Sequence, residues 1–236
     1  ASLADRAAAA ARIGGVGLVG ALVALAFQLT GSLAVDGHAL EVATHGQLVL
    51  NAGTLALKAL LFLLGLLVLP LAARTISTPQ VSEYFALLLL ATLGMGFMVT
   101  SRNLLGAFVA LELVSLSLYA LTALNPARKK SAEAALKYFT YGGVASAFLL
   151  FGISYLFGAL GQLDITQATL AEAPRLVVVA YLFILVGLGF KLALAPFHLW
   201  APDVYQAAPT PAAAWIASGS KIAGVALLLA LLGPVR

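Results

Sequence analysis

The sequence predicts an all-α polytopic membrane protein with about seven transmembrane helices. Of its 236 residues, 62% are hydrophobic and 9% are charged, and the mean hydropathy is +1.05. Apolar runs near the ~20 residues that a helix needs to cross a bilayer core recur along the chain. Short polar segments separate these runs, and no linker or second domain is apparent. We therefore expect a single membrane domain over residues 1–236.

The first four expected spans cover residues 13–30, 51–73, 84–101 and 103–124. Each is an apolar run that a polar segment ends. The segment 31–50 alternates polar and apolar residues and contains no Lys or Arg, which is typical of a loop or short hairpin. The third and fourth spans are almost continuous, so their division depends on the polar residues of "SRNLLG".

Three further spans are expected at residues 133–158, 175–198 and 211–233. The first of them follows the basic segment "PARKK" and contains small residues that permit close helix packing. The other two flank "APFHLWAPDVYQAAPTP", whose prolines remove backbone donors, so the entering helix should break near Pro196. Backbone groups freed at membrane depth are tolerated where they are buried in protein or line a wet cavity.

Charge and composition limit the possible functions. If the spans alternate in direction, six Lys and Arg residues lie on the side of the N-terminal segment and three on the other, which places that segment in the cytoplasm. The net charge of +4 therefore reflects topology, and nucleic acid is not an expected partner. The absence of Cys from the sequence excludes disulfides, thiolate metal sites and iron–sulfur clusters bound by this chain.

Five ionisable residues lie within the expected spans: Lys58, Glu112, Lys137, Lys191 and Lys221. An ionised group near the bilayer centre costs about 2.5 to 3.5 kcal/mol on insertion scales, so such groups face a polar interior, pair with each other, or titrate. They are candidates for a proton path, while salt bridges between helices would explain them structurally. Lys58, two turns inside its span, is expected to be structural.

Glu112 lies about nine residues from either end of its expected helix, where so short a side chain cannot reach the membrane surface. Ser115 and Tyr119 follow at i+3 and i+7, which predicts a polar stripe facing the bundle interior. Lys137 lies about one turn beyond Glu133, near the cytoplasmic end, and could extend to the interface. Close packing of its helix would instead let Lys137 pair with Glu112.

Lys191 and Lys221 are both expected to be deep, since long apolar runs precede the first and follow the second. Burial favours the neutral form of a lysine and a nearby carboxylate favours the charged form, so moving the carboxylate changes whether the lysine keeps its proton. His198, beside the expected break, could pass protons between the lysines or act only as a hydrogen-bonding group. Trp200 and Trp215 are expected as interfacial anchors, and no motif predicts a metal site or nucleotide site.

Three stretches carry a family resemblance: "ALELVSLSLYAL", "SAEAALKYF" and "GFKLALAPFHLWAPDVYQAAPTPAAAWIASGSK". They resemble the proton-conducting antiporter-like subunits of respiratory complex I, the NADH:quinone oxidoreductase, and "EAALKYF" is most similar to the subunit N branch, the counterpart of mitochondrial NADH dehydrogenase subunit 2. The resemblance covers about residues 45 to 236. It implies the second to eighth helices of the family, with a first five-helix antiporter-like repeat over residues 84–232, and neither the first helix nor the second repeat.

The resemblance also implies a site and a setting. The proton relay would consist of Glu112, Lys137, Lys191, His198 and Lys221, with a pair of Glu112 and a lysine as an electrostatic switch. Proton translocation would be coupled to quinone reduction elsewhere in the complex, within a bacterial inner membrane. This chain would hold no cofactor, because flavin, iron–sulfur clusters and quinone belong to partner subunits. Its partners would be the other membrane subunits, the lipid bilayer, protons and water.

Two alternatives stay open on the sequence. A subunit of a Mrp-type sodium/proton antiporter or of a membrane-bound hydrogenase would carry the same resemblance. A structural membrane scaffold, whose buried charges only hold helices together, would share the composition and the spans.

Overall fold

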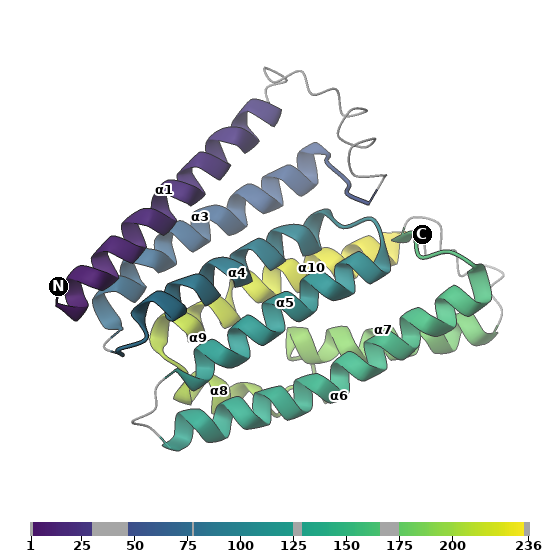
Figure 1. Cartoon of the computed structure of the whole chain (residues 1–236). Coiled ribbons are helices and arrows are strands. Elements are labelled where there is room, and N and C mark those ends of the chain that lie inside the picture. The colour runs from purple at the N-terminus through teal and green to yellow at the C-terminus, as the bar shows by residue number, and fades with distance from the viewer. Residues whose placement is uncertain (1, 30–46, 77, 125–128, 166–174, 234–236) are drawn as a thin grey trace.

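The structure, a computed structural model, describes residues 2–29, 47–76, 78–124, 129–165 and 175–233. Helices dominate these ranges. With the labels of Figure 1 they are α1 (Leu3–Leu29), α3 (Ala52–Thr75), α4 (Val81–Thr100), α5 (Leu104–Ala123), α6 (Lys129–Leu160), α7 (Arg175–Leu192), α8 (Ala201–Ala207), α9 (Thr210–Ala217) and α10 (Gly219–Leu232).

Within the described ranges, seven stretches are long and apolar enough to cross a membrane, with α9 and α10 together forming the last. The predicted fold class, an all-α polytopic membrane protein, is confirmed. The first span begins at Leu3 instead of residue 13, because the alanine-rich segment before the apolar run continues the helix. The predicted loop or hairpin over 31–50 falls on residues outside the described ranges, apart from its last four.

The helices form an elongated bundle whose members run back and forth along one direction (Figure 1). α1 and α3 pair along one edge, α4, α5 and α10 lie in the middle, and α6 and α7 form the opposite edge. The N-terminal end of α1, the end of α3 and the start of α6 lie at the same end of the bundle. This is the alternation of direction on which the predicted charge asymmetry depends.

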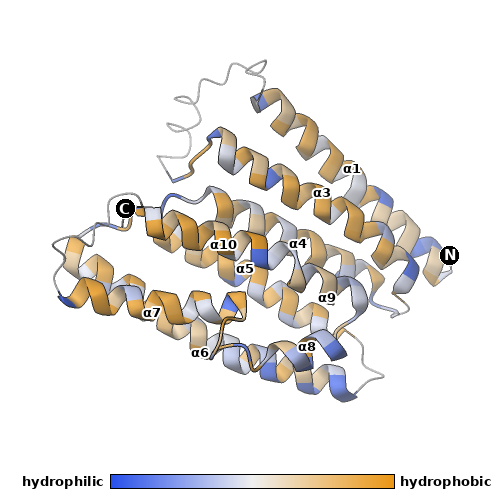
Figure 2. Cartoon of the chain, turned by 180° about the vertical axis from the view of Figure 1, so that it is seen from behind, coloured by the Kyte–Doolittle hydropathy of each residue, from blue (hydrophilic) through white to orange (hydrophobic). Residues whose placement is uncertain are grey.

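Apolar side chains cover both the inside and the outside of the bundle. Leu61, Leu88 and Leu118 are fully buried between helices, while Leu67 and Leu182 are 68% and 58% exposed. In Figure 2 the hydrophobic colour accordingly surrounds most helices, and the hydrophilic colour gathers at α8 and the adjacent end of α6. A bundle that lies in lipid can expose apolar residues in this way, because lipid tails are as apolar as its core.

The predicted break of this helix near Pro196 is confirmed. The helix ends at Leu192, four residues before Pro196, and Leu192 carries the carbonyl that the proline ring would meet if the helix continued. Ala193 adopts a left-handed φ of 56°, and the N–H of Leu194 donates to the carbonyl of Gly189 over 2.8 Å. This pattern closes the last turn of a helix through a left-handed residue. The chain then turns through residues 193–200 into the short helix α8.

The predicted division between the third and fourth spans is confirmed at residues 101–103. This segment is tied to two others that are distant in the sequence. The N–H of Val49 donates to the Thr100 carbonyl over 2.7 Å, and the N–H of Ile165 donates to the Arg102 carbonyl over 2.9 Å. An ion pair of 2.8 Å joins Arg102 Nε to Asp164 Oδ2. We call this group of contacts the 101–103 clamp; it lies at the end of the bundle opposite the start of α6 (Figure 1).

Candidate functional site

Lys191 lies in the last turn of α7 and is 2% exposed, so its predicted burial is confirmed. Its Nζ donates to Ser115 Oγ of α5 over 3.1 Å. The Ser115 hydroxyl in turn donates to the carbonyl of Leu111 over 2.8 Å. A buried cation is therefore held against a neutral oxygen, one that can both accept and donate a hydrogen bond.

Lys221 reaches the same region from the third residue of α10. Its Nζ donates to the main-chain carbonyl of Lys191 over 2.7 Å. Because α7 ends at Leu192, that carbonyl is among the last four of the helix, which have no partner within the helix. The C-terminal end of a helix carries a partial negative charge that favours a cation. The break thus supplies the acceptor that holds Lys221.

Trp200 forms another wall of the Lys221 site, which corrects its prediction as an interfacial anchor. It is 1% exposed, and Trp215, predicted in the same way, is fully buried. The Trp200 indole N–H donates to the Phe190 carbonyl over 3.1 Å, and Lys221 Nζ lies 4.9 Å from the centroid of its ring. The segment after α7 folds back onto the bundle, which carries the tryptophan inside; composition alone does not reveal this reversal.

Glu112 faces α6 from the middle of α5, where the Ser146 hydroxyl donates to its Oε1 over 2.5 Å. Ser115 and Tyr119, which follow on the same face, are 2% and 8% exposed. The predicted polar stripe on α5 therefore faces the interior. It brings the Glu112 carboxylate to α6 and the Ser115 hydroxyl to Lys191 on α7.

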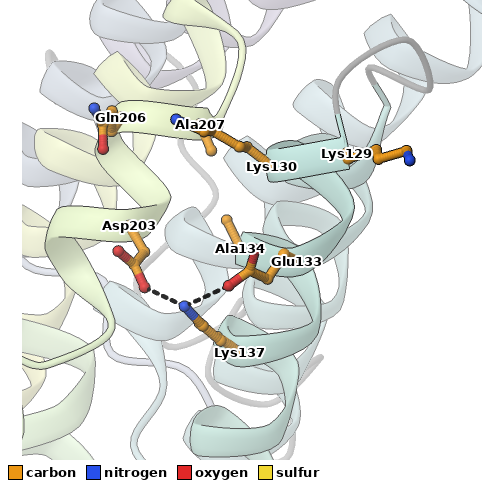
Figure 3. A pocket seen from close by; sticks show the side chains of 8 residues that line it. All are labelled: Lys129, Lys130, Glu133, Ala134, Lys137, Asp203, Gln206 and Ala207. Carbon is orange, nitrogen blue, oxygen red and sulfur yellow. Dashed lines mark hydrogen bonds and ion pairs between the residues drawn. The ribbon is translucent and has the colours of Figure 1, made fainter.

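The predicted pair of Lys137 and Glu112 does not form; Lys137 has other partners. Its Nζ forms ion pairs of 2.8 Å with Glu133 Oε1 on its own helix and with Asp203 Oδ2 on α8 (Figure 3). Ser146, the residue of α6 that contacts Glu112, lies nine positions further along the helix. That spacing corresponds to ~13 Å of helix rise, which a lysine side chain does not span.

The ion pairs of Lys137 line an open, polar cavity of about 610 Å³ at the end of the bundle where α6 begins. We call it the α6–α8 mouth. Its lining contains Lys129, Lys130, Glu133, Lys137 and Asp203. Asp203 lies in the first turn of α8. That α8 packs against α6 was not visible in the sequence, so the pairing with Lys137 was missed.

The remaining ionisable candidates lie outside this arrangement. His198 is next to the break, as predicted, but its side chain is exposed, and Lys221 contacts the backbone of Lys191 directly. Lys58 lies on α3 with its Nζ 5.9 Å from the centroid of the Phe97 ring of α4. A search of the described residues finds no group of three or more His, Cys, Asp or Glu that could hold a metal ion.

Comparison with known proteins agrees with this architecture. A family model described as "NADH:quinone oxidoreductase/Mrp antiporter, TM" matches residues 101–235. The NADH-quinone oxidoreductase subunit N 2 of Acidobacterium capsulatum is 48% identical over 189 residues, which are 75% of this chain and 38% of that protein. The chain thus spans well under half the length of this relative.

Solved structures show the same fold. A chain of respiratory complex I from Thermus thermophilus, solved with bound aureothin, matches with a TM-score of 0.69 at 34% identity, over 95% of this chain and 52% of that chain. A chain of the Mrp complex from Dietzia sp. also matches with a TM-score of 0.69, over 98% of this chain and 48% of its own, and its 24% identity limits that likeness to the fold. The resemblance to complex I subunits of the subunit N branch is confirmed, and the chain belongs to the NADH:quinone oxidoreductase/Mrp antiporter membrane family.

Proposed function

We propose that this chain forms part of a proton-translocating membrane subunit of an NADH:quinone oxidoreductase, similar to subunit N. One observation carries the proposal: two lysines from different helices meet at the break of α7 and contact neutral oxygens. Among the described residues, no ion pair with a carboxylate involves Lys191 or Lys221. A scaffold would match each buried charge with an opposite one, whereas a lysine held by neutral acceptors is free to gain and lose a proton.

The proposed path begins at the α6–α8 mouth, which lies at the end that the charge asymmetry assigns to the cytoplasm. Lys137 and Asp203 would receive protons there, and Glu112, about two and a half helical turns deeper, would adjust the charge of the interior. Lys191 and Lys221 would be the central stations. His198 would be a further proton carrier beside the break, where the residue is exposed.

We further propose that residues 84–232 are the first antiporter-like repeat and that a second repeat outside these residues continues the path. The coverage supports this, since the chain matches 52% of the Thermus thermophilus chain. Flavin, iron–sulfur clusters and quinone would reside in partner subunits. Energy from quinone reduction would reach the lysines through charge and conformational coupling. The bacterial relatives support placement in a bacterial inner membrane.

Lysine substitution in the assembled complex, reconstituted in liposomes, tests the proposal. Lys191→Ala and Lys221→Ala should abolish most proton uptake driven by NADH oxidation. Lys58→Ala is the matched control, because Lys58 is also a lysine within a span but contacts an aromatic ring away from the break. Normal pumping by an assembled Lys191→Ala complex would overturn the proposal in favour of a scaffold.

The Mrp-type antiporter is the second candidate function, favoured by the shared fold. It requires proton movement to depend on sodium and not on NADH or quinone. The 48% identity to a subunit N, against 24% to the Mrp chain, supports the oxidoreductase. Sodium-dependent proton movement in vesicles that lack NADH would reverse this order.

A further inference from the structure

A small cavity lies between α5, α6 and α7, at the point where the two halves of the proposed path approach each other. The polar residues of its lining are Ser115, Ser146, Tyr119 and Lys191. Its volume is about 10 Å³, which is the space that one water-sized sphere occupies. The rest of the lining is apolar, so the polar groups converge on one small space.

Two glycines line this space, and each lies where a side chain would collide with a neighbouring helix. A Cβ on Gly187 of α7 would lie 2.6 Å from the Leu149 Cβ and 2.9 Å from the Ala145 carbonyl of α6. A Cβ on Gly142 of α6 would overlap the Tyr119 hydroxyl. Any larger residue at either position would displace the hydroxyl or fill the gap.

Hydrogen bonds lead into the cavity from both sides. On one side the Ser146 hydroxyl is bonded to the Glu112 carboxylate over 2.5 Å. On the other side the Ser115 hydroxyl accepts from Lys191 Nζ over 3.1 Å. Both serine hydroxyls line the cavity. Each serine is thus bonded to one of the two charged residues, and the cavity separates Ser115 from Ser146.

We propose that this cavity binds one water molecule, and that Ser115, Ser146 and this water form a proton bridge between Glu112 and Lys191. The inference rests on the proposed function and assigns two residues to it. A buried water needs two to four polar partners, which the three hydroxyls and the ammonium provide. Each hydroxyl has one donor and two acceptor sites, so each can receive a proton on one side while releasing its own on the other.

The proton balance of one transfer is simple. The Ser115 hydroxyl, which donates to the Leu111 carbonyl in this structure, first turns towards the water. The Lys191 ammonium then gives up one proton to the Ser115 oxygen, whose own proton passes to the water. The water releases a proton to Ser146, and the original Ser146 proton reaches the Glu112 carboxylate. Lys191 ends neutral and Glu112 protonated, while the serines and the water regain their starting composition. No oxidant, reductant or further reactant is required.

Serine-to-alanine variants test the bridge in the assembled complex in liposomes. Ser115→Ala and Ser146→Ala should each slow NADH-driven proton uptake about 100-fold, the lower end of the effect of a positioned proton-transfer group. Ser117→Ala is the matched control, because Ser117 is also a buried serine of α5 that donates to the carbonyl four residues before it, yet it lies outside the cavity. The double variant Ser115→Ala/Ser146→Ala should be little slower than either single variant, since both interrupt one chain.

Two outcomes separate failure of the bridge from failure of the proposed function. If Lys191→Ala stops pumping while Ser115→Ala and Ser146→Ala behave like Ser117→Ala, the relay stands and the bridge is wrong. If Lys191→Ala pumps normally, both are wrong.

A cryo-electron microscopy map of the unmodified complex, at a resolution that shows buried waters, provides a measurement without variants. A peak bonded to Ser115 and Ser146 would support the bridge, and an empty cavity beside other visible waters would overturn it.

Discussion

The side-chain ammonium of Lys221 caps the helix that carries Lys191, by donating to the Lys191 carbonyl over 2.7 Å. The contact exists only because α7 stops at Leu192; one more turn of helix would give that carbonyl an N–H partner. The end of α7 therefore links the two lysines through the backbone. The Lys221 ammonium is thus held by the main chain of the residue whose side chain bonds to Ser115.

Trp200 is expected to position Lys221. Trp200→Leu removes the ring face below the ammonium and the indole N–H bond to Phe190, whereas Trp200→Phe keeps a ring. A cation over an aromatic face is worth about 0.5 to 2 kcal/mol. NADH-driven proton uptake should therefore fall severalfold in the leucine variant and recover partly in the phenylalanine variant. Trp215→Leu, which empties an equally buried site, controls for lost packing; an equal loss of pumping there would contradict the positioning role.

The ion pair across the α6–α8 mouth should be sensitive to salt. Asp203→Asn removes the carboxylate that joins α8 to Lys137, and Glu133→Gln removes the one on Lys137's own helix. Because both pairs are solvent-accessible, water screens them and each contributes little to stability. Proton uptake should decrease in Asp203→Asn more than in Glu133→Gln. This difference should shrink in 1 M salt, where screening acts over about 3 Å; a difference independent of salt would contradict an electrostatic role.

Gly187→Ala should destabilise the contact between α6 and α7. The added methyl would lie 2.6 Å from the Leu149 Cβ, and overpacking of this kind costs about 1 to 3 kcal/mol. Gly143→Ala on α6 is the matched control, because a Cβ there meets nothing within 4 Å. Thermal unfolding of the purified protein in lipid measures both variants. A Gly187→Ala protein as stable as the Gly143→Ala protein would show that the helices separate without strain.

Glu112→Gln distinguishes charge from structure at the centre of α5. The amide oxygen can still accept the bond from Ser146, so the complex should assemble and reduce quinone. Without the carboxylate, the interior loses the only charge that faces α6 from this helix face in the described residues. The rate of NADH-driven proton uptake should fall by about 100-fold or more. Unchanged uptake would assign Glu112 to packing.

The sequence predicted the spans because apolar length in a membrane protein depends on local composition. It predicted the burial of Lys191 for the same reason, since a lysine that follows a long apolar run cannot reach the surface. The polar stripe of Glu112, Ser115 and Tyr119 was accessible from helical spacing. These features depend on residues close together in the chain.

The errors arose where distant segments meet. The burial of Trp200 and the pairing of Lys137 with Asp203 both depend on the reversal after α7, which brings α8 against α6. Helical period does not determine how far one helix slides along another, so the expected pair of Glu112 and Lys137 was misaligned by more than two turns. The hydrogen bond from Ser146 to Glu112 was not predicted either, because the sequence does not show which residues of the two helices face each other.

The 101–103 clamp gives the bundle two mechanically different ends. At the clamped end, main-chain bonds and the ion pair of Arg102 with Asp164 fasten three distant segments together. At the other end, the seven-residue helix α8 is joined to α6 through solvent-accessible ion pairs. We therefore expect the helices to move most at the α6–α8 mouth during turnover and least at the 101–103 clamp.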